Sequence, residues 1–393
     1  MMPVETVTPF DKRLEIDLGE NFHVEEIIIA GDRGPCGGVN MAVEVTFEVL
    51  GLVAGREDVY ANNDPVHNDL LTAEFERQGL IIRPDIKSIP DGSILIASAH
   101  GWSPKDKEIA KRKNLLVIDV TCQLVEKVGR AAQRAVAEGK HVLYVGSDDH
   151  PEPRGILGRL PEGSYTFINI KDDAPKIRSP LVIFDEDDMR EGESKVLKAN
   201  VEEFAVLNQT TLSTVGVVKK IEELREVNPY ADIPDPMGIC YATGNRQEAV
   251  RERLFDSQSE PIDALFVTGS KSSHNSTELK DVGEIERKIP SYLINSPEEI
   301  DPSWFNPDIK RVMITSGASV LDPYLLRVIK YFTDRGARPT FIQSREKKPK
   351  IDPQTREPII NPDTGEQVYE ELFFVGPDLD LLWKRYERTS TVN

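Results

Sequence analysis

The sequence is poor in cysteine and has no long apolar run. Its 393 residues include only three cysteines, Cys36, Cys122 and Cys240. This small odd number excludes the paired disulfide framework of small secreted proteins. No run of about 18 uncharged apolar residues occurs, and the opening residues, MMPVETVTPFDKRLE, do not pass from a basic segment into an apolar one. We therefore expect a cytoplasmic protein without a membrane-spanning segment.

Positive charge is also scarce. The chain has 48 Lys and Arg against 67 Asp and Glu, which gives a formal net charge of -19. No basic run offsets this balance, so nucleic acid is not an expected partner. With 39% hydrophobic residues over this length, the chain can build several cores, and we expect a multidomain protein.

Each cysteine stands directly before a predicted helix. The run EEIIIAGDRGPC passes from a strand through a glycine turn to Cys36, and GGVNMAVEVTFEVLGL then has apolar residues at helical spacing. NLLVIDVTC and QLVEKVGRAAQRAVAEG repeat this order around Cys122. Cys240 follows a Pro-rich linker and precedes the helical ATGNRQEAVRERLF. This pattern predicts three α/β units, each with a cysteine at a helix N-terminus, where the dipole is expected to lower the thiol pKa.

Other predicted strands end in polar residues. These strands are GSILIASAH, KHVLYVGSDDH, FAVLNQTT, ALFVTGSKSSH and RVMITSGAS. The carboxyl ends of parallel strands are where α/β proteins bind ligands. Imidazole, hydroxyl and amide groups beside helix N-termini suit a phosphate or diphosphate. The candidate residues near these ends are His67, His100, His150, Glu152, Thr210, Ser273, Asn275 and Ser319. We expect His23 and His141, which lack this context, at the surface.

The cysteines leave three interpretations open. Three thiolates from separate units can hold an iron-sulfur cluster that keeps one position free for substrate. A zinc ion with three cysteines and a water is the second. In the third, the cysteines are unrelated buried thiols that act as small apolar residues.

Eight segments carry a resemblance to a known family. In order along the chain they are GPCGGVNMAVE, SAHGWS, DVTCQLVEKV, HPE, QTTLS, ICYATGNRQEAVR, GSKSSHNS and TSGAS. Together they resemble the LytB family of 4-hydroxy-3-methylbut-2-enyl diphosphate reductases, from about residue 25 to about residue 335. All three cysteines lie inside matching segments.

The resemblance implies an architecture. It is that of three pseudo-symmetric α/β domains around a central 4Fe-4S cluster. We assign the domains to residues 25–121, 122–239 (with the linker) and 240–342. Residues 1–24 form an N-terminal extension, and residues 343–393 form a C-terminal tail.

The resemblance also implies site residues and a reaction. Cys36, Cys122 and Cys240 would hold the cluster, while Glu152 and Thr210 would organise the hydroxyl end of the substrate, with Glu152 in proton delivery. The reaction removes that hydroxyl as water and gives isopentenyl and dimethylallyl diphosphate, the last step of the non-mevalonate isoprenoid pathway. Electrons would come from ferredoxin or flavodoxin. The expected diphosphate-binding residues are His67, His100, His150, Ser273, His274, Asn275 and Ser319.

The residue types suit this chemistry. Hydroxide is a poor leaving group, so its removal needs a Lewis acid, an electron source and a proton donor in one place. A carboxyl group can donate a proton at neutral pH only if its pKa is raised. We expect burial and nearby negative charge to raise the pKa of Glu152.

Four positions depart from the family pattern. The family usually has an acidic residue and Arg at Asn40 and Met41, Pro at Gln123, and Ser at His274. Protonated His274 would add a charge-assisted contact to the diphosphate, unless the ring points away. Two other classes, a zinc-dependent hydrolase and a non-catalytic phosphate-binding module, stay open, but neither accounts for the eight ordered segments.

Overall fold

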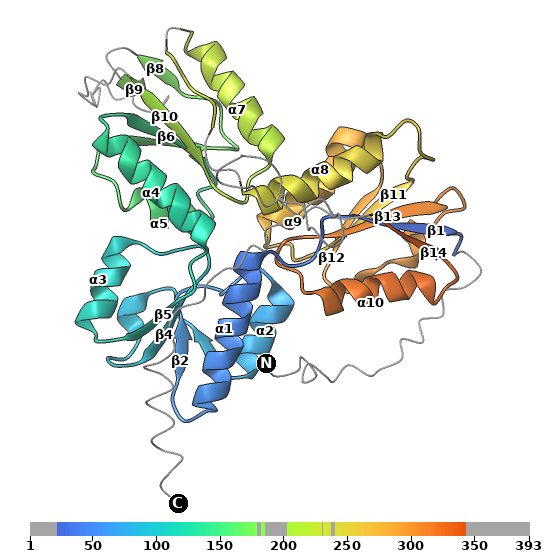
Figure 1. Ribbon diagram of the computed structural model, residues 1–393, viewed down its shortest axis with the longest axis horizontal. Helices are drawn as coiled ribbons and strands as arrows, with labels where there is room; N and C mark the ends of the chain where they lie inside the picture. The colour runs from blue at the N-terminus through green and yellow to red at the C-terminus, as the bar shows by residue number, and fades with distance from the viewer. Residues whose placement is uncertain (1–21, 179–181, 185–202, 230, 237–239, 343–393) are drawn as a thin grey trace, which may run out of the picture.

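The chain forms three lobes that meet near the centre of the molecule (Figure 1). The computed structural model describes residues 22–178, 182–184, 203–229, 231–236 and 240–342. The assigned C-terminal tail, most of the N-terminal extension and part of the linker lie outside these residues. Each lobe is built on a parallel sheet, so the predicted α/β class is confirmed.

The first lobe has a four-stranded sheet between helices. Its strands, in sheet order, are β3 (Leu80–Ile82), β2 (Val59–Ala61), β4 (Ile94–Ala97) and β5 (Leu116–Asp119). One face packs against α1 (Gly37–Val53) and α2 (Asp69–Arg77), and the other against α3 (Pro104–Arg112) and the 3₁₀ turn η1 (Ile86–Ser88).

The second lobe has a three-stranded sheet. Its strands, in sheet order, are β10 (Phe204–Asn208), β6 (His141–Gly146) and β7 (Tyr165–Asn169). Helices α4 (Gln123–Ala137) and α5 (Pro151–Leu157) cover one face, and α7 (Thr214–Val227) covers the other. A separate antiparallel pair consists of β8 (Lys176–Arg178) and β9 (Val182–Phe184).

The third lobe has the largest sheet, with five strands. In sheet order they are β12 (Ser291–Ile294), β11 (Ala264–Thr268), β13 (Arg311–Ser316), β1 (Glu26–Ile29) and β14 (Arg338–Phe341). Helix α10 (Asp322–Thr333) covers one face, and α8 (Tyr241–Phe255) and α9 (His274–Asp281) cover the other. The short turns of this lobe are the π-helical η2 (Val282–Arg287) and the 3₁₀ η3 (Pro297–Glu299) and η4 (Pro302–Trp304).

The first strand belongs to the last sheet. Sequence order places β1 in the first unit, residues 25–121, but it pairs in parallel with β13 and β14 of the third lobe. Its side chains are buried on both faces of this sheet. Ile27 and Ile29 are fully buried on the face that α10 covers, and Ile28 is buried on the face that α8 and α9 cover. A short apolar strand buried on both faces needs a neighbour on each side, and its sequence does not say which.

Aromatic packing anchors the core of the third lobe. Phe266, in β11, is fully buried, and its ring lies 5.1 Å from the ring of Phe332 and 5.9 Å from that of Phe305. Tyr292 and Trp304 complete the group at ring distances of 5.0 Å and 6.2 Å. These rings join the sheet, α10 and the η4 turn in one apolar cluster.

Replacing Phe266 tests this cluster. We expect Phe266→Ala to lower the free energy of unfolding by about 3–5 kcal/mol, because it removes a buried ring and leaves a cavity. The control is Phe255→Ala, because Phe255 is 51% exposed and surface substitutions change stability by about 0.5 kcal/mol. Urea titration followed by circular dichroism measures both. Equal effects would show that the cluster does not hold the lobe together.

Candidate active site

The predicted site residues lie just beyond the carboxyl ends of parallel strands. Histidines follow three of these strands, with His67 after β2, His100 after β4 and His150 after β6. Three hydroxyl residues do the same, with Thr210 after β10, Ser273 after β11 and Ser319 after β13. Strand ends of this kind leave side chains and backbone groups free for a ligand. The site therefore draws residues from all three lobes.

Each cysteine is the N-cap residue of a helix, as the sequence predicts. Cys36 begins α1, Cys122 begins α4 and Cys240 begins α8. None of the three thiols caps its helix through a side-chain hydrogen bond. All three are free thiols that form no disulfide.

The turn before Cys36 is tied to the third lobe. The Cys36 N–H donates to Ala318 O at 3.0 Å, and Arg246 Nη2 donates to Gly34 O at 2.8 Å. Gly34 has φ +75°, and a Cβ there would lie 2.6 Å from Asp322 Oδ1, so only glycine fits. Because Arg246 belongs to α8, it also links this turn to the helix that Cys240 begins.

Burial, rather than the helix dipole, determines the direction in which the pKa values of the Cys122 and Cys240 thiols shift. It raises the pKa of Cys122 to about 12 and that of Cys240 to about 11, and repulsion from Cys36 adds to both shifts. Backbone N–H groups of Leu124 and Ala242 act in the opposite direction. The expectation that the helix N-termini lower these pKa values is thus wrong for Cys122 and Cys240, because desolvation outweighs the hydrogen bonds.

The cysteine arrangement fits a cluster better than a single metal ion. Sulfur ligands of one tetrahedral zinc ion, at Zn–S distances of about 2.3 Å, lie about 3.8 Å apart. Among the described residues, the cysteines do not form a group of three with ligand atoms within 4.8 Å of one another. They are nevertheless close enough to repel one another as thiolates. A larger, positively charged iron-sulfur core suits this wider spacing and would favour the thiolate forms.

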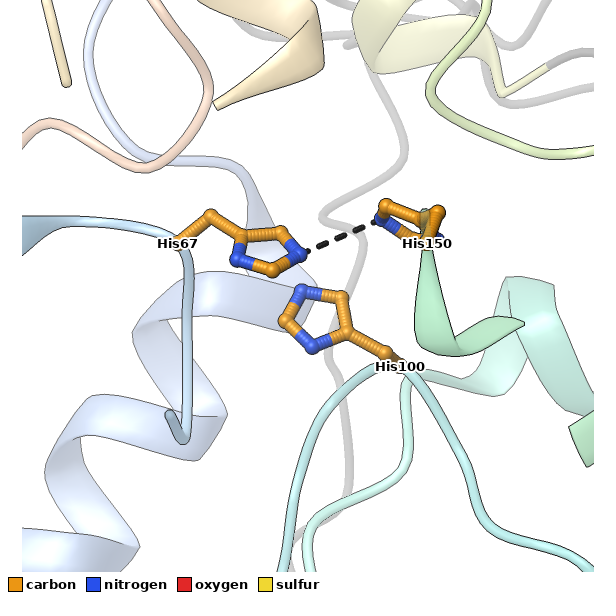
Figure 2. A group of neighbouring side chains, drawn as sticks. All are labelled: His67, His100 and His150. Atoms are coloured by element: carbon orange, nitrogen blue, oxygen red, sulfur yellow. Dashed lines mark hydrogen bonds between the residues drawn. The ribbon is translucent and has the colours of Figure 1, made fainter. Parts of the chain in front are cut away.

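Three histidines, one from each of three strand ends, meet in a compact group (Figure 2). The rings of His67 and His100 are stacked with centroids 3.9 Å apart, and His67 Nε2 lies 3.2 Å from His150 Nε2. Their ligand atoms lie within 4.8 Å of one another, as in a metal site. Stacked rings, however, direct their in-plane nitrogen atoms along similar lines, so this arrangement suits hydrogen bonding to an extended ligand better than coordination of one ion.

Burial keeps these rings neutral. It lowers the pKa of His67 to about 4 and that of His150 to about 2, and it lowers the pKa of His100 well below the usual value. His150 Nδ1 accepts a hydrogen bond of 3.2 Å from the Glu152 N–H, so the neutral ring carries its proton on Nε2. His150 is therefore a donor toward the group in Figure 2.

Several buried polar atoms of the predicted diphosphate-binding residues have no hydrogen-bond partner within the protein. They are His100 Nδ1, Asn275 Nδ2 and Ser319 Oγ. The same residues are fixed through other atoms, since Asn275 Oδ1 accepts from Ala318 N–H at 2.9 Å and Ser319 O accepts from Asn68 Nδ2 at 2.7 Å. A buried unpaired polar group costs about 1–3 kcal/mol. Such groups are expected where a polar ligand completes the bonding.

Glu152 is a buried carboxyl group with its hydrogen-bond partners on the second lobe. It is fully buried, and burial raises its pKa to about 7. Its Oε1 accepts from Thr210 N–H at 2.8 Å and its Oε2 from Thr210 Oγ1 at 2.7 Å, and these bonds limit the rise in pKa. The expected direction of the shift is confirmed, and its cause is desolvation. Glu152 can therefore carry a proton near neutral pH.

Comparison with known proteins identifies the family. A family model described as LytB protein matches residues 27–333. A relative from Vibrio parahaemolyticus, named 4-hydroxy-3-methylbut-2-enyl diphosphate reductase, is 34% identical over 78% of this chain and 89% of its own length. One of the same name from Acinetobacter baumannii is 32% identical over 82% and 94%. The chain belongs to the LytB protein family. This LytB chain also contains, in its described part, no helix long and apolar enough to cross a membrane.

Solved structures agree with this assignment. The Plasmodium falciparum E-1-hydroxy-2-methyl-but-2-enyl-4-diphosphate reductase aligns with a TM-score of 0.67 and 27% identity, over 83% of the LytB chain and 94% of its own. A second structure is described as (E)-4-hydroxy-3-methyl-but-2-enyl diphosphate reductase, the terminal enzyme of the non-mevalonate pathway. It aligns with a TM-score of 0.52 and 27% identity, over 79% and 100%.

The four departures from the family pattern have different surroundings in this LytB protein. Asn40 and Gln123 are exposed at the first turns of α1 and α4. Met41 is buried in the apolar core of the first lobe. His274 lies beside the group in Figure 2, with its ring 5.3 Å from that of His150. Of the four, His274 is therefore the one placed against the site.

One histidine is buried where the sequence predicts a surface position, and two neighbours of the site were not predicted from the sequence. The prediction of a surface position for His141 is wrong, because it is 1% exposed at the start of β6, where its Nε2 lies 2.8 Å from Thr166 Oγ1. His23 is partly buried. Tyr144, whose hydroxyl donates to Glu152 Oε1 at 3.3 Å, and the buried Arg246 also escaped notice. Tyr144 lies in a strand and Arg246 in a helix, and the sequence gives no signal that separates them from ordinary core residues. Their hydrogen bonds to Glu152 and to Gly34 O connect them to the site.

The titration of Glu152 can be observed directly. Because the pKa of Glu152 is about 7, the infrared band of its protonated carboxyl group should disappear as the pH rises through 7. The same band should be absent in Glu152→Gln. Thr210→Val removes a hydrogen bond to the carboxylate and should move this titration to higher pH. Glu278, whose pKa burial also raises to about 7, is the internal control, because its band should persist in both variants. If Glu152→Gln kept every band of the wild-type spectrum, the assignment of the titrating band to Glu152 would be wrong.

Proposed function

We propose that this chain removes the hydroxyl group of 4-hydroxy-3-methylbut-2-enyl diphosphate as water, with two electrons and two protons, to give isopentenyl and dimethylallyl diphosphate. The names of its relatives support this reaction. The observation that carries it is the arrangement of three cysteines, each at a helix N-terminus and near enough to the others to repel them as thiolates, together with the buried carboxyl of Glu152. The chain is thus an oxidoreductase of isoprenoid biosynthesis.

The cofactor in this proposal is a 4Fe-4S cluster held by Cys36, Cys122 and Cys240. When bound, it supplies the reducing electrons and a Lewis-acidic iron that is not occupied by a protein ligand. The three helix N-termini add favourable electrostatic potential for a cluster with negatively charged thiolates. N–H groups such as those of Leu124 and Ala242, which act on the sulfur atoms, would tune its potential.

The diphosphate end of the substrate would be held mainly by neutral groups. The unpaired atoms His100 Nδ1, Asn275 Nδ2 and Ser319 Oγ offer hydrogen bonds. Ser273 is the N-cap residue of α9, so the positive end of that helix dipole lies at the same site. His67 and His274 complete the set. Such a site can bind an anion in a protein with net charge -19.

Glu152 would supply a proton at the hydroxyl end. Below about pH 7 the carboxyl is protonated, and Thr210 holds both of its oxygen atoms in place. Thr210 Oγ1 can also donate to the substrate hydroxyl once Glu152 carries the proton. Protonation of the departing oxygen turns hydroxide into water, which lowers the barrier to its loss.

The cellular setting follows from the same proposal. We place the enzyme in the cytoplasm, with ferredoxin or flavodoxin as the electron donor. The unit boundaries near residues 121 and 240 also belong to the proposal, and the start of a cysteine-capped helix just after each one supports them.

Replacing Glu152 separates proton delivery from binding. Glu152→Gln should lower kcat about 10²–10⁴-fold, because the amide cannot act as an acid, while iron content and affinity for inorganic diphosphate stay near wild type. The matched control is Glu278→Gln, which alters a partly buried carboxyl of similar pKa on α9 and should keep its turnover. Anaerobic turnover with dithionite measures both. Normal turnover of Glu152→Gln would remove Glu152 from the proton path.

Metal analysis tests the cluster itself. Protein purified without oxygen should be brown and contain iron and sulfide, and Cys36→Ser, Cys122→Ser and Cys240→Ser should each lose most of both. A colourless wild-type protein containing zinc would instead support a zinc-dependent hydrolase. Unchanged iron content in any of the three variants would remove that cysteine from the ligand set.

A further inference from the structure

His274 forms a contact between two lobes at the edge of the histidine group. It is the first residue of α9, on the third lobe, and its ring lies 5.3 Å from that of His150 on the second. Its Nε2 lies 3.5 Å from Oδ1 of Asp149, the residue before His150. The ring thus lies between a carboxylate and the proposed diphosphate site.

Asp149 is held firmly although it is half exposed. Its Oδ1 accepts from Ser147 Oγ at 2.6 Å, and its Oδ2 accepts from Lys171 Nζ at 3.0 Å. These two bonds, followed by the charge of His274, lower the pKa of Asp149 to about 2. The carboxylate therefore stays ionised at any pH at which the enzyme works, and its orientation is set from the second lobe.

Among the four histidines of the site, His274 is the one best placed to carry a proton. His67, His100 and His150 are more deeply buried than His274. A positive charge on His274 would also disfavour a second positive charge on any of these three rings. For His274 itself, burial lowers the pKa below its usual value and Lys171 lowers it as well, whereas the carboxylate of Asp149 opposes this shift. In the described part of the chain, His274 is the one histidine with a carboxylate oxygen within 4.0 Å.

We propose that, when diphosphate is bound, His274 is the single cationic imidazole of the site, and that Asp149, fixed by Ser147 and Lys171, is the positioning residue that orients this ring and stabilises its charge. This inference rests on the proposed function. A diphosphate beside the ring would favour the imidazolium against the effect of burial, because a second anion then faces the ring together with Asp149. A charge-assisted hydrogen bond of this kind is about twice as strong as a neutral one.

The proposal predicts an effect opposite in sign to simple charge repulsion. If Asp149 acted only as a nearby negative charge, Asp149→Asn would strengthen the binding of an anion. If it supports the charge on His274, the same change should weaken binding of inorganic diphosphate about three- to tenfold at pH 7. The matched control is Asp148→Asn, an exposed neighbour that undergoes the same change in charge. This variant should bind as tightly as wild type or slightly more tightly.

Calorimetry on the anaerobically purified holoenzyme measures these affinities. Because diphosphate itself titrates near neutral pH, the useful quantity is the ratio of wild-type to His274→Ser affinity at each pH, in which the titration of the ligand cancels. We expect this ratio to be about ten at pH 6 and to fall toward one at higher pH. Asp149→Asn in the His274→Ser background should cause no further loss, because its effect acts through the ring.

Two results would overturn the proposal. One is a ratio that does not change with pH, and the other is Asp149→Asn binding as tightly as Asp148→Asn. Iron content and melting temperature of each variant show whether it is folded and loaded.

Turnover separates this inference from the proposed function. In His274→Ser the loss should appear in KM more than in kcat, because the diphosphate is bound similarly before and during the reaction. If the wild-type protein reduced no substrate but the calorimetric pattern held, the proposed reaction would fail while the anion site stood. If turnover were normal but the pattern absent, the roles of His274 and Asp149 alone would fail.

Discussion

Desolvation at the junction of the three lobes controls the ionisable groups of the site. It raises the pKa values of Cys122, Cys240 and Glu152, and it lowers those of His67 and His150. All of these shifts favour the neutral form, so the protein alone places little charge in its own centre. A cluster with its three thiolates and a diphosphate would both bring negative charge, and each would find hydrogen-bond donors already in place. The site is thus complementary to a pair of charged ligands.

The fold supports this arrangement through its parallel sheets. Every strand of a parallel sheet ends on the same edge, and each lobe turns that edge toward the other two (Figure 1). Contacts between lobes then fix the loops. Cys36 N–H is bonded to Ala318 O, and the side chain of Arg246 reaches Gly34 O. Because these bonds join different lobes, the geometry of the site depends on how the lobes pack and not on any single loop.

The sequence was sufficient for features that depend on local pattern. The helix after each cysteine, the strands that lead to His100, His150 and Thr210, and the α/β class were all predicted correctly. Features that depend on distant neighbours were not. The pairing of β1 with β13 and β14, the burial of His141 and the high pKa of Cys122 each result from groups far along the chain. Periodicity reports which face of an element is apolar, but it does not report which other element covers that face.

The position of β1 has a consequence for how the protein is made. This strand leaves the ribosome early, yet both of its neighbours, β13 and β14, are synthesised about three hundred residues later, after the other two lobes. Domains that emerge first generally fold first, but here the last sheet cannot close until its earliest strand returns to it. The turn that carries Cys36 follows β1 directly and is held by Ala318 O, so it takes its final shape only then. Loading of a metal cluster would therefore belong to the end of biogenesis, after translation of the whole fold.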